Sequence, residues 1–306
     1  MNKKIYILPL IIFLVPLVLT SQVGIVNKGT GKINNEGKII VKKNSLSNEL
    51  GGLIINTQNA RIEIEDNAGM TSDGLINNQG VIESFGHIAK IAQPSIDGTV
   101  IIDNDKDTRN VPQLSYNNIL LKGKGIKELR TNNAILESRN YFFSGDSASI
   151  IWNKASTGIE IHSLNETEHN GSINPAFLYG NYVLVGKAAQ NISGSGRFVN
   201  LELDNSQGAD VINKTGNTPN GFQVARELRL TSGELRNSLD ANFRMGDSST
   251  IIRNFGGSLA NNPIFEGRVD VNYIGTGQMT TGGEIPTSVS NLQELVVEND
   301  GGIILN

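Results

Sequence analysis

The chain of 306 residues has no cysteine, only eight prolines, 6% aromatic residues and 18% charged residues. Without cysteine it can form no disulfide, thiolate zinc site, iron–sulfur cluster or cysteine nucleophile. The formal net charge of −4 excludes a basic nucleic-acid surface as the dominant feature. Asparagine and glycine are abundant, at 38 and 34 residues, and together they disfavour helix. With 38% apolar residues the chain can still bury a core.

Residues 1–21 are predicted to be a signal peptide that is cleaved after Ser21. Lys3 and Lys4 supply a positive start, and an apolar stretch follows from Ile5 to Leu19. A retained transmembrane anchor is the alternative, but these 15 residues are short for a roughly 30 Å hydrocarbon core. Cleavage predicts export through the inner membrane and no membrane span in the mature chain. The expected location is extracellular or at the cell surface, or the periplasm if export ends there.

A repeat of about 21 residues runs through the first third of the chain. Units begin at Gly31, Gly52 and Gly74, and a more degenerate copy begins at Asp97. Each unit reads as a strand, a turn containing Asn with Gly or Ala, and a second strand with alternating apolar residues. The recurring positions are Asn34, Asn56 and Asn77 and, further along each unit, Ile40, Ile62 and Ile82.

The second half repeats on a longer unit. Strands of alternating polarity followed by polar residues and Gly begin at Tyr116, Phe198 and Leu292, and GDSASII at Gly145 returns as GDSSTII at Gly246. Tyr116 lies 29 residues before Gly145, whereas Phe198 lies 48 residues before Gly246. The difference is close to one unit of the first half, which predicts one additional turn of the same coil.

A single unit cannot fold alone. Burying about six apolar side chains gains roughly 9 to 18 kcal/mol, whereas ordering 21 residues costs roughly 30 kcal/mol. Stacking units in parallel gives each strand neighbours above and below and one continuous core. The sequence therefore predicts an all-β fold, a β-solenoid of parallel strands. Two antiparallel sandwiches would fit the strand spacing, but they give no reason for a repeat of 21 or 22 residues.

The solenoid has a 21-residue repeat over residues 22–112 and longer units over residues 113–306. The mature chain is expected to be an elongated all-β rod. Asn and Gly suit the corners because both tolerate positive φ, and stacked Asn side chains can form amide ladders. Period-2 alternation predicts which side chains face inward. The inward residues include Ile62, Ile64, Leu201 and Leu203, whereas Glu63 and Glu202 face solvent; the other alternating pairs are Val183 and Val185, Leu228 and Leu230, and Val269 and Val271.

Four tracts carry a resemblance to a known class of proteins: GLINNQGVIES, SGSGRFVNLELDNSQGADVI, LRLTSGELRN and NLQELVVENDGGIIL. They resemble the repeat regions of large, adhesin-like surface proteins secreted by Bacteroidetes-type bacteria, in the parallel β-helix class. The resemblance covers most of residues 24–306 and includes no catalytic motif. It implies a right-handed β-helix and an extracellular or cell-surface location. It does not extend to the folded sorting domain of the type IX secretion route, so the export route and the anchoring stay open.

Two polar clusters invite a metal-site interpretation. His162 and His169 lie in HSLNETEHN, where no fixed spacing makes them converge; a solvated loop is expected there, and His87 stands alone. Asp103, Asp105 and Asp107 imitate the start of an EF-hand loop, but Thr108 and Leu114 occupy the positions that need Gly and Glu. The Asp cluster is therefore either a weak calcium site or a charged turn between strands.

No catalytic residue can be assigned from the sequence, and neither can a cofactor-binding or metal-binding residue. Asp146 and Asp247 precede strands as turn residues, and SGSGR around Ser195 lacks the spacing of a nucleophile elbow. We expect a non-catalytic structural or adhesive protein. The alternatives are a carbohydrate-binding module and a glycan-cleaving β-helix enzyme. Tyr141, Phe142, Phe143 and Trp152 form the only aromatic concentration, for which a hydrophobic corner is favoured over a sugar-binding face.

The expected partners are surface glycans or other proteins, and no nucleic acid. Residues 295–305 are as apolar as an internal unit. A solenoid that ended there would offer unpaired strand groups to other chains. This predicts either a fragment of a longer protein or end-to-end self-association.

Overall fold

The computed structural model describes residues 4–7, 12–14, 18–21, 24–129, 135–145, 148–152, 159–173, 180–212, 221–237 and 243–306. The regular structure in these ranges consists of β-strands, which pair in parallel and stack as a β-solenoid. The predicted fold class is therefore confirmed. The chain divides into two compact units: unit 1 comprises residues 1–139 and 147–156, and unit 2 comprises residues 140–146 and 157–306.

Unit 1 is built from short strands. They are β1 (Lys4–Ile7), β2 (Ile12–Leu14), β3 (Val18–Ser21), β4 (Gly24–Asn27), β5 (Lys32–Asn35), β6 (Lys38–Val41), β7 (Asn44–Asn48), β8 (Leu53–Asn56), β9 (Arg61–Ile64), β10 (Ala68–Ser72), β11 (Leu75–Asn78), β12 (Val81–Ser84), β13 (His87–Ile91), β14 (Ser95–Asp103), β15 (Arg109–Asn110), β16 (Ser115–Lys122), β17 (Ile126–Leu129) and β19 (Ser149–Trp152). The strand β18 (Ile135–Ser144) is divided between the units.

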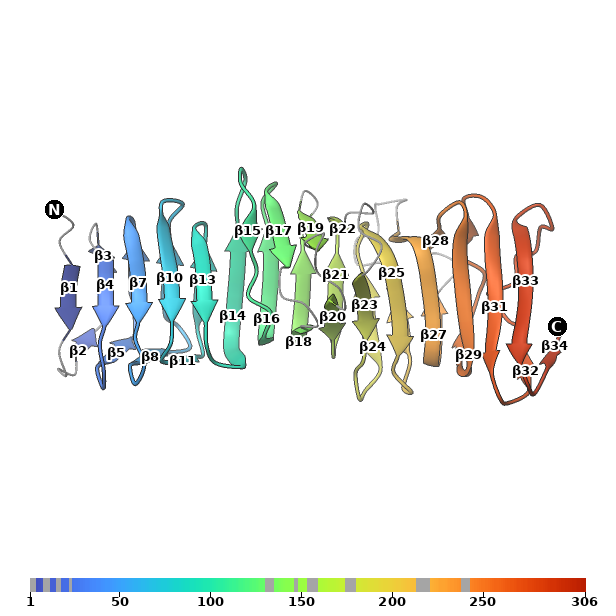
Figure 1. Ribbon diagram of the computed structural model, residues 1–306, viewed down its shortest axis with the longest axis horizontal. Helices are drawn as coiled ribbons and strands as arrows, with labels where there is room; N and C mark the ends of the chain where they lie inside the picture. Colours follow the sequence, from blue (N-terminus) through green and yellow to red (C-terminus); the bar gives the residue numbers. More distant parts are fainter. Residues whose placement is uncertain are drawn as a thin grey trace. The chain divides into compact units, whose positions relative to one another are not determined.

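Each early turn of unit 1 contributes one strand to each of three parallel sheets. The sheets run in the orders β1-β4-β7-β10-β13, β2-β5-β8-β11 and β3-β6-β9-β12-β14-β16. Figure 1 shows β4, β7, β10 and β13 side by side, in blue to cyan. The second sheet ends at β11, where the Gln93 carboxamide takes the place of a strand. Its Oε1 accepts from the amide N of Ile76 at 2.6 Å, and its Nε2 donates to the Ile76 carbonyl at 3.0 Å.

The described parts of the predicted signal peptide form β1, β2 and β3, which pair with β4, β5 and β6. Cleavage after Ser21 stays a prediction. No helix among the described residues is long and apolar enough to cross a membrane.

Alternation along β9 places its apolar side chains inside. Ile62 and Ile64 are fully buried, and Glu63 lies between them on the outer face. Each such isoleucine contributes roughly 1.5 to 3 kcal/mol by leaving water. The inward and outward assignment predicted for these three residues is confirmed.

The asparagine repeat is real, but two of its three positions were assigned one residue too early. The register aligns Asn35 with Asn56 and Asn56 with Asn78. Because side chains alternate between the faces of a strand, Asn34 and Asn77 point outward instead. A repeat found only by spacing is ambiguous by one residue where two asparagines are adjacent, and the face of the sheet decides between them.

The isoleucine repeat contains the same kind of error. Ile62 is aligned with Ile82 and with Ile39, so Ile40 lies on the outer face in register with Glu63. Ile39 is buried, whereas Ile40 is half-buried.

Two amide ladders run along the corners of unit 1, as predicted. Each ladder amide is buried and donates to the amide or hydroxyl of the next turn, which satisfies polar groups inside the core. The bonds are Asn27 to Asn48 (2.7 Å), Asn48 to Ser72 (3.0 Å), Asn35 to Asn56 (2.7 Å) and Asn56 to Asn78 (2.6 Å). Tolerance of positive φ, the other reason given for asparagine at the corners, is mostly wrong. Asn44 is the only asparagine with positive φ among the described residues.

Unit 2 contains longer strands. They are β20 (Ile159–Ser163), β21 (Glu166–His169), β22 (Ser172–Ile173), β23 (Gly180–Leu184), β24 (Gln190–Ser193), β25 (Arg197–Asp204), β26 (Ala209–Val211), β27 (Gln223–Asn237), β28 (Arg244–Met245), β29 (Ser249–Leu259), β30 (Ile264–Phe265), β31 (Val269–Gly275), β32 (Met279–Thr280), β33 (Leu292–Asn299) and β34 (Ile303–Ile304). The long strand β27 pairs with β25 along its first part and with β26 along its last. Figure 1 shows β25, β27, β29, β31 and β33 side by side, in yellow to red.

The inward rows of unit 2 follow the predicted alternation except at β23. There Tyr182 and Leu184 are aligned with Leu201 and Leu203 and face inward, and the alternating pair Val183 and Val185 lies on the other face. The inward prediction for Leu201 and Leu203 is confirmed, and Leu228, Leu230, Val269 and Val271 lie inward as well; all six are nearly or fully buried. Glu202 lies outward, as predicted, and accepts from the Thr231 hydroxyl at 2.6 Å.

A stack of aromatic rings fills part of the interior of unit 2. Each contact adds about 0.5 to 1.5 kcal/mol beyond the burial of area. The rings follow the order Phe142, Tyr182, Phe198, Phe222 and Phe243, with centroid separations of 5.2, 5.1, 5.4 and 4.9 Å. Their sequence spacing is irregular, so no repeat revealed the stack.

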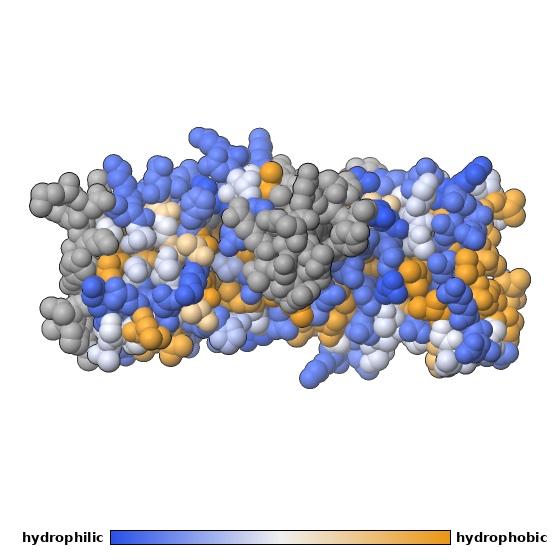
Figure 2. Space-filling model, in the orientation of Figure 1, coloured by the Kyte–Doolittle hydropathy of each residue, from blue (hydrophilic) through white to orange (hydrophobic). Residues whose placement is uncertain are grey.

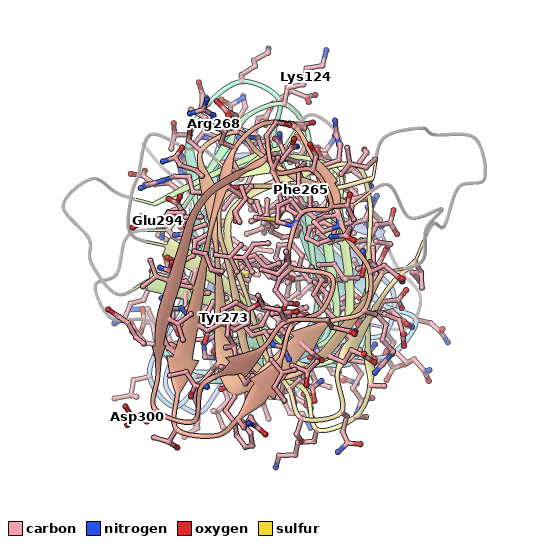
Figure 3. The ribbon with its side chains drawn as sticks, turned by 90° about the vertical axis from the view of Figure 1, so that its right-hand side faces the viewer. Lys124, Phe265, Arg268, Tyr273, Glu294 and Asp300 are labelled. Carbon is pink, nitrogen blue, oxygen red and sulfur yellow. The ribbon has the colours of Figure 1, made fainter. Side chains whose placement is uncertain are left out.

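The last long strand, β33, has apolar side chains in inward register that are only partly covered. Leu295 is aligned with Val271 and Val297 with Tyr273, yet Leu295 is 38% exposed and Val297 45%. Figure 2 shows apolar surface gathered over β29, β31 and β33. Figure 3 shows Tyr273 directed into the interior and Glu294 directed outward.

Candidate functional site

A pocket in unit 1 arises because three neighbouring links between strands differ in length. The link from β9 to β10 has three residues, that from β12 to β13 has two, and that from β14 to β15 has five. The short middle link leaves a notch of about 440 Å³ between two longer ones, with the half-buried Phe85 beneath it. We call it the notch pocket. Its lining residues are Asp66, Asn67, Phe85, Asp103, Asn104, Asp105, Lys106, Asp107 and Arg109.

Two cations lie inward beside the notch pocket. Arg109 and Lys127 are neighbours in register on β15 and β17. The ammonium of Lys127 is fully buried and donates to the carbonyls of Gly123 at 2.7 Å and Gly125 at 2.8 Å. It also donates to the Asn104 carbonyl at 3.3 Å.

Arg109 is nearly fully buried and is held by groups of the short middle link. Its Nε donates to the Phe85 carbonyl at 3.3 Å, and its Nη1 lies 3.0 Å from Nε2 of His87. The Asp107 carboxylate lies 3.6 Å from the same Nη1.

The acidic turn supplies counter-charge to these cations. Burial lowers the pKa of Lys127 to about 8, and the carboxylates of Asp103 and Asp105 oppose that shift. Burial, and then repulsion from Asp105, raises the pKa of Asp103, whereas Lys122 and Lys127 lower it. Of the two interpretations of the Asp103, Asp105 and Asp107 motif, this pattern supports the charged turn. Among the described residues, no three His, Cys, Asp or Glu side chains are grouped as metal ligands.

The histidines lie in three different settings, and the prediction of a solvated loop for HSLNETEHN is wrong. Residues 166–169 form β21, whose alternation turns His169 into the core, where its ring centroid lies 4.4 Å from that of Phe198. Burial lowers the pKa of His169 to about 4. His162 lies on β20 beside Glu160, with 2.6 Å between Nε2 and the carboxylate, and His87 lies in unit 1 beside Arg109.

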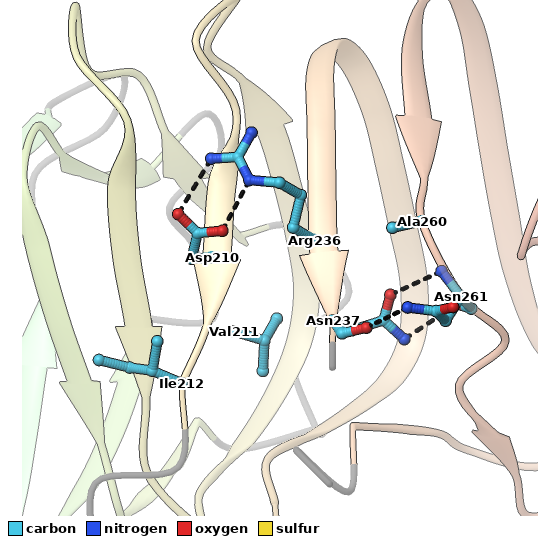
Figure 4. Close-up of a pocket in the computed structure, with 7 residues that line it drawn as sticks. All are labelled: Asp210, Val211, Ile212, Arg236, Asn237, Ala260 and Asn261. Atoms are coloured by element: carbon cyan, nitrogen blue, oxygen red, sulfur yellow. Dashed lines mark hydrogen bonds and ion pairs between the residues drawn. The ribbon is translucent and has the colours of Figure 1, made fainter. Parts of the chain in front are cut away.

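A groove in unit 2, of about 500 Å³, lies where β26, β27 and β29 end (Figure 4). Arg236 and Asp210 form a bidentate ion pair on it, at 2.6 and 3.0 Å, and this hydrogen bonding lowers the pKa of Asp210. The Asn237 side chain bonds to both the carbonyl and the amide N of Asn261. These polar groups are therefore paired mainly with one another.

A buried ionic cluster ties the segment after β32 to the interior of unit 2. Glu284 is fully buried, and its Oε1 accepts from the Tyr273 hydroxyl at 2.8 Å and from the Gly282 amide N at 2.9 Å. Arg253 donates to the same oxygen and to the Thr280 carbonyl. The sequence held no signal for this cluster, because its members come from separate elements without a repeated spacing.

The remaining predicted positions have structural surroundings. Asp247 lies in the turn before β29 and accepts from the amide N of Arg268, just before β31, at 2.9 Å, whereas Asp146 lies outside the described residues. Phe142 belongs to the aromatic stack, and the Tyr141 hydroxyl donates to Glu168 at 2.9 Å. The Trp152 side chain lies outside the described part of the chain.

The notch pocket thus combines a cavity, the aromatic ring of Phe85 and a buried Oδ1 of Asn104 that has no hydrogen-bond partner among the described residues. No family model, curated protein or solved structure matches this chain.

Proposed function

We propose that this chain is an extracellular or cell-surface structural β-solenoid with an adhesive role and no enzymatic activity. The observation that carries the proposal is the regular outer surface of the stacked turns. A parallel sheet places outward side chains about 4.8 Å apart from strand to strand, so a partner meets a regularly spaced row of groups along the stacked turns.

One such row crosses β6, β9 and β12 of unit 1. Lys38 lies 2.8 Å from the carboxylate of Glu63, Arg61 lies 3.5 Å from the same group, and Arg61 also pairs with Glu83. Lys38 and Arg61 are in register with one another, and so are Glu63 and Glu83, so a row of positive groups lies beside a row of negative groups and pairs with it. An outer row of this kind suits recognition of a repetitive or extended partner, because many weak contacts along the row together give a higher overall affinity than any one contact.

Unit 2 supports the same role through its outer face. Glu202, Arg229, Ile252, Asn272 and Val296 follow one another in register across β25, β27, β29, β31 and β33. The row mixes charge, amide and apolar groups, which suits surface glycans or proteins as partners. End-to-end association of copies is part of the proposal, motivated by the exposed apolar side chains of β33.

Localisation and adhesion can be tested together in the organism that makes the protein. We expect amino-terminal sequencing of the mature protein to begin at Gln22, and protease added to intact cells to remove it. Deleting the gene should reduce attachment of cells to glycan-coated or protein-coated surfaces, and adding purified residues 22–306 should compete with attachment. A protein that keeps residues 1–21 in the cytoplasm would overturn the localisation, and unchanged attachment would overturn the adhesive role.

Carbohydrate binding by an aromatic platform is the second candidate, because one exposed ring is suitably placed. Phe255 is 57% exposed, and its ring lies against Gly277, where any side chain would collide with it. A flat ring of this kind can stack on a sugar. Binding to a glycan array that is lost in Phe255→Ala but kept in Val289→Ala would support this function, and release of new reducing ends would identify glycan cleavage.

A further inference from the structure

We propose that the notch pocket of unit 1 binds an organic ligand through a protonated primary amine. This site is separate from the outer rows invoked for adhesion, so either proposal can fail without the other. An amino sugar, a lysine side chain and a polyamine share this chemistry.

The shape of the pocket fits a small organic group. Ligand pockets commonly span about 300 to 1,000 Å³, and the notch of about 440 Å³ falls within that range. One wall is the link that contains Asp66, the other is the end of β14 with the link that follows it, and Phe85 lies in the short link between them. A ligand that enters the notch therefore meets an aromatic ring and two polar walls.

The charge of the lining favours a cation. Four aspartates face Lys106 and Arg109 in the lining, and the buried ammonium of Lys127 lies next to it, so these groups together carry a formal net charge of −1. The repulsion that Asp103 experiences from Asp105 and Asp66 is relieved when a positive group enters. Phe85 lines the pocket, and its ring can add a cation–π contact to an ammonium placed over its face.

The distribution of the carboxylates favours an ammonium over a metal ion. A calcium ion needs six to eight oxygens converging on one point, and no three acidic or histidine side chains among the described residues are grouped in that way. An ammonium instead carries three donors that can reach separate acceptors. Asn104, which lines the pocket and is 3% exposed, keeps a buried Oδ1 with no hydrogen-bond partner among the described residues, and an N–H donor would satisfy it.

The direct test is a binding titration of the full chain by calorimetry and NMR. The probes are spermidine, glucosamine and Nα-acetyl-lysine amide, each compared with its N-acetylated form at the amine. We expect the free amines to bind and perturb signals around the notch pocket, and acetylation to weaken binding at least tenfold. The relative strengths of the three amines distinguish the sources. Equal binding of the acetylated forms, or no binding of any amine at millimolar concentration, would overturn the proposal.

Variants locate the site and exclude a metal. Asp66→Asn and Asp107→Asn remove exposed carboxylates of the lining, and each should weaken amine binding about three- to tenfold; Asp66→Asn should do so with an unchanged melting temperature. Asp73→Asn removes an exposed carboxylate outside the pocket and should leave binding unchanged. Calcium chloride is titrated in parallel. Calcium binding that is stronger than amine binding and is lost in Asp66→Asn would overturn the proposal in favour of a metal site.

Discussion

The buried imidazole of His169 should make the protein sensitive to mild acid. The ring stacks on Phe198, its Nε2 lies 3.2 Å from the Arg197 carbonyl, and its Nδ1 has no hydrogen-bond partner among the described residues. Burial lowers the pKa of His169 to about 4 in the folded chain, against an ordinary value of 6.5, and the bond to the Arg197 carbonyl opposes that shift only in part.

The sign follows from proton binding. Between pH 6.5 and pH 4 the unfolded chain binds a proton at this position and the folded chain does not, so the free energy of unfolding falls as the pH falls through that range. At 1.36 kcal/mol per pKa unit, the total loss is about 3 kcal/mol, of which about 2 kcal/mol appears between pH 7 and pH 5.

The assay is chemical unfolding followed by circular dichroism at pH 5, 6 and 7. His169→Gln removes the titration, so its free energy of unfolding should fall by about 2 kcal/mol less between pH 7 and pH 5 than that of the parent chain. The matched control is His162→Gln, which removes a half-buried histidine paired with Glu160. If His169→Gln keeps the full acid dependence, the argument from burial is refuted.

Three further perturbations test the core. Raising the pH from 7 to 9 should increase the free energy of unfolding, because the unfolded chain keeps the Lys127 proton that the folded chain loses near pH 8. Denaturant titrations should show that Lys127→Met abolishes this increase. A free energy of unfolding that falls with pH in the parent chain would contradict the reasoning. Leu203→Asp should lower the free energy of unfolding by more than about 4 kcal/mol, because it buries an unpaired carboxylate. Glu202→Ala should lower it by less than about 1 kcal/mol. Similar melting temperatures for the two variants would mean that the register is wrong. Asn56→Ala should lower the free energy of unfolding by about 2 to 4 kcal/mol, because it leaves ladder groups on both sides unpaired. Asn34→Ala, which removes an outward asparagine, is the control in thermal unfolding. Equal losses of stability in the two variants would count against the ladder.

The fold could be predicted from the sequence because its determinants are local and periodic. Alternation of apolar residues set the inward face of β9 and β25, and the 21-residue step identified the stack. The same method misplaced Asn34 and Asn77 by one residue, since the neighbouring asparagines at 35 and 78 fit the step equally well. Only the hydrogen-bonding register distinguishes the two faces.

The candidate site could be predicted only in part. The Asp103, Asp105 and Asp107 motif was recognised as a charged cluster, but its partners were not, because Lys127 is brought beside it by the stacking of a later turn. The notch pocket depends on the difference in length between links on neighbouring turns. Such differences in link length can be used to locate a pocket only after the register of the strands is known.

The amide ladders of unit 1 also bear on how the chain finds its native alignment. Ile33, Ile54 and Ile76 occupy one inward column, so the apolar core would accept a stack in which one whole turn is skipped. The ladder column differs from turn to turn, since it passes from Asn48 to Ser72, and a hydroxyl cannot reproduce the two donors of an amide. A stack that joined Asn27 directly to Ser72 would keep an amide-to-hydroxyl bond of the kind that Asn48 makes, but it would lose the bond between Asn27 and Asn48. The polar columns therefore favour the complete stack over a shortened one, because every turn that is included adds a buried side-chain hydrogen bond.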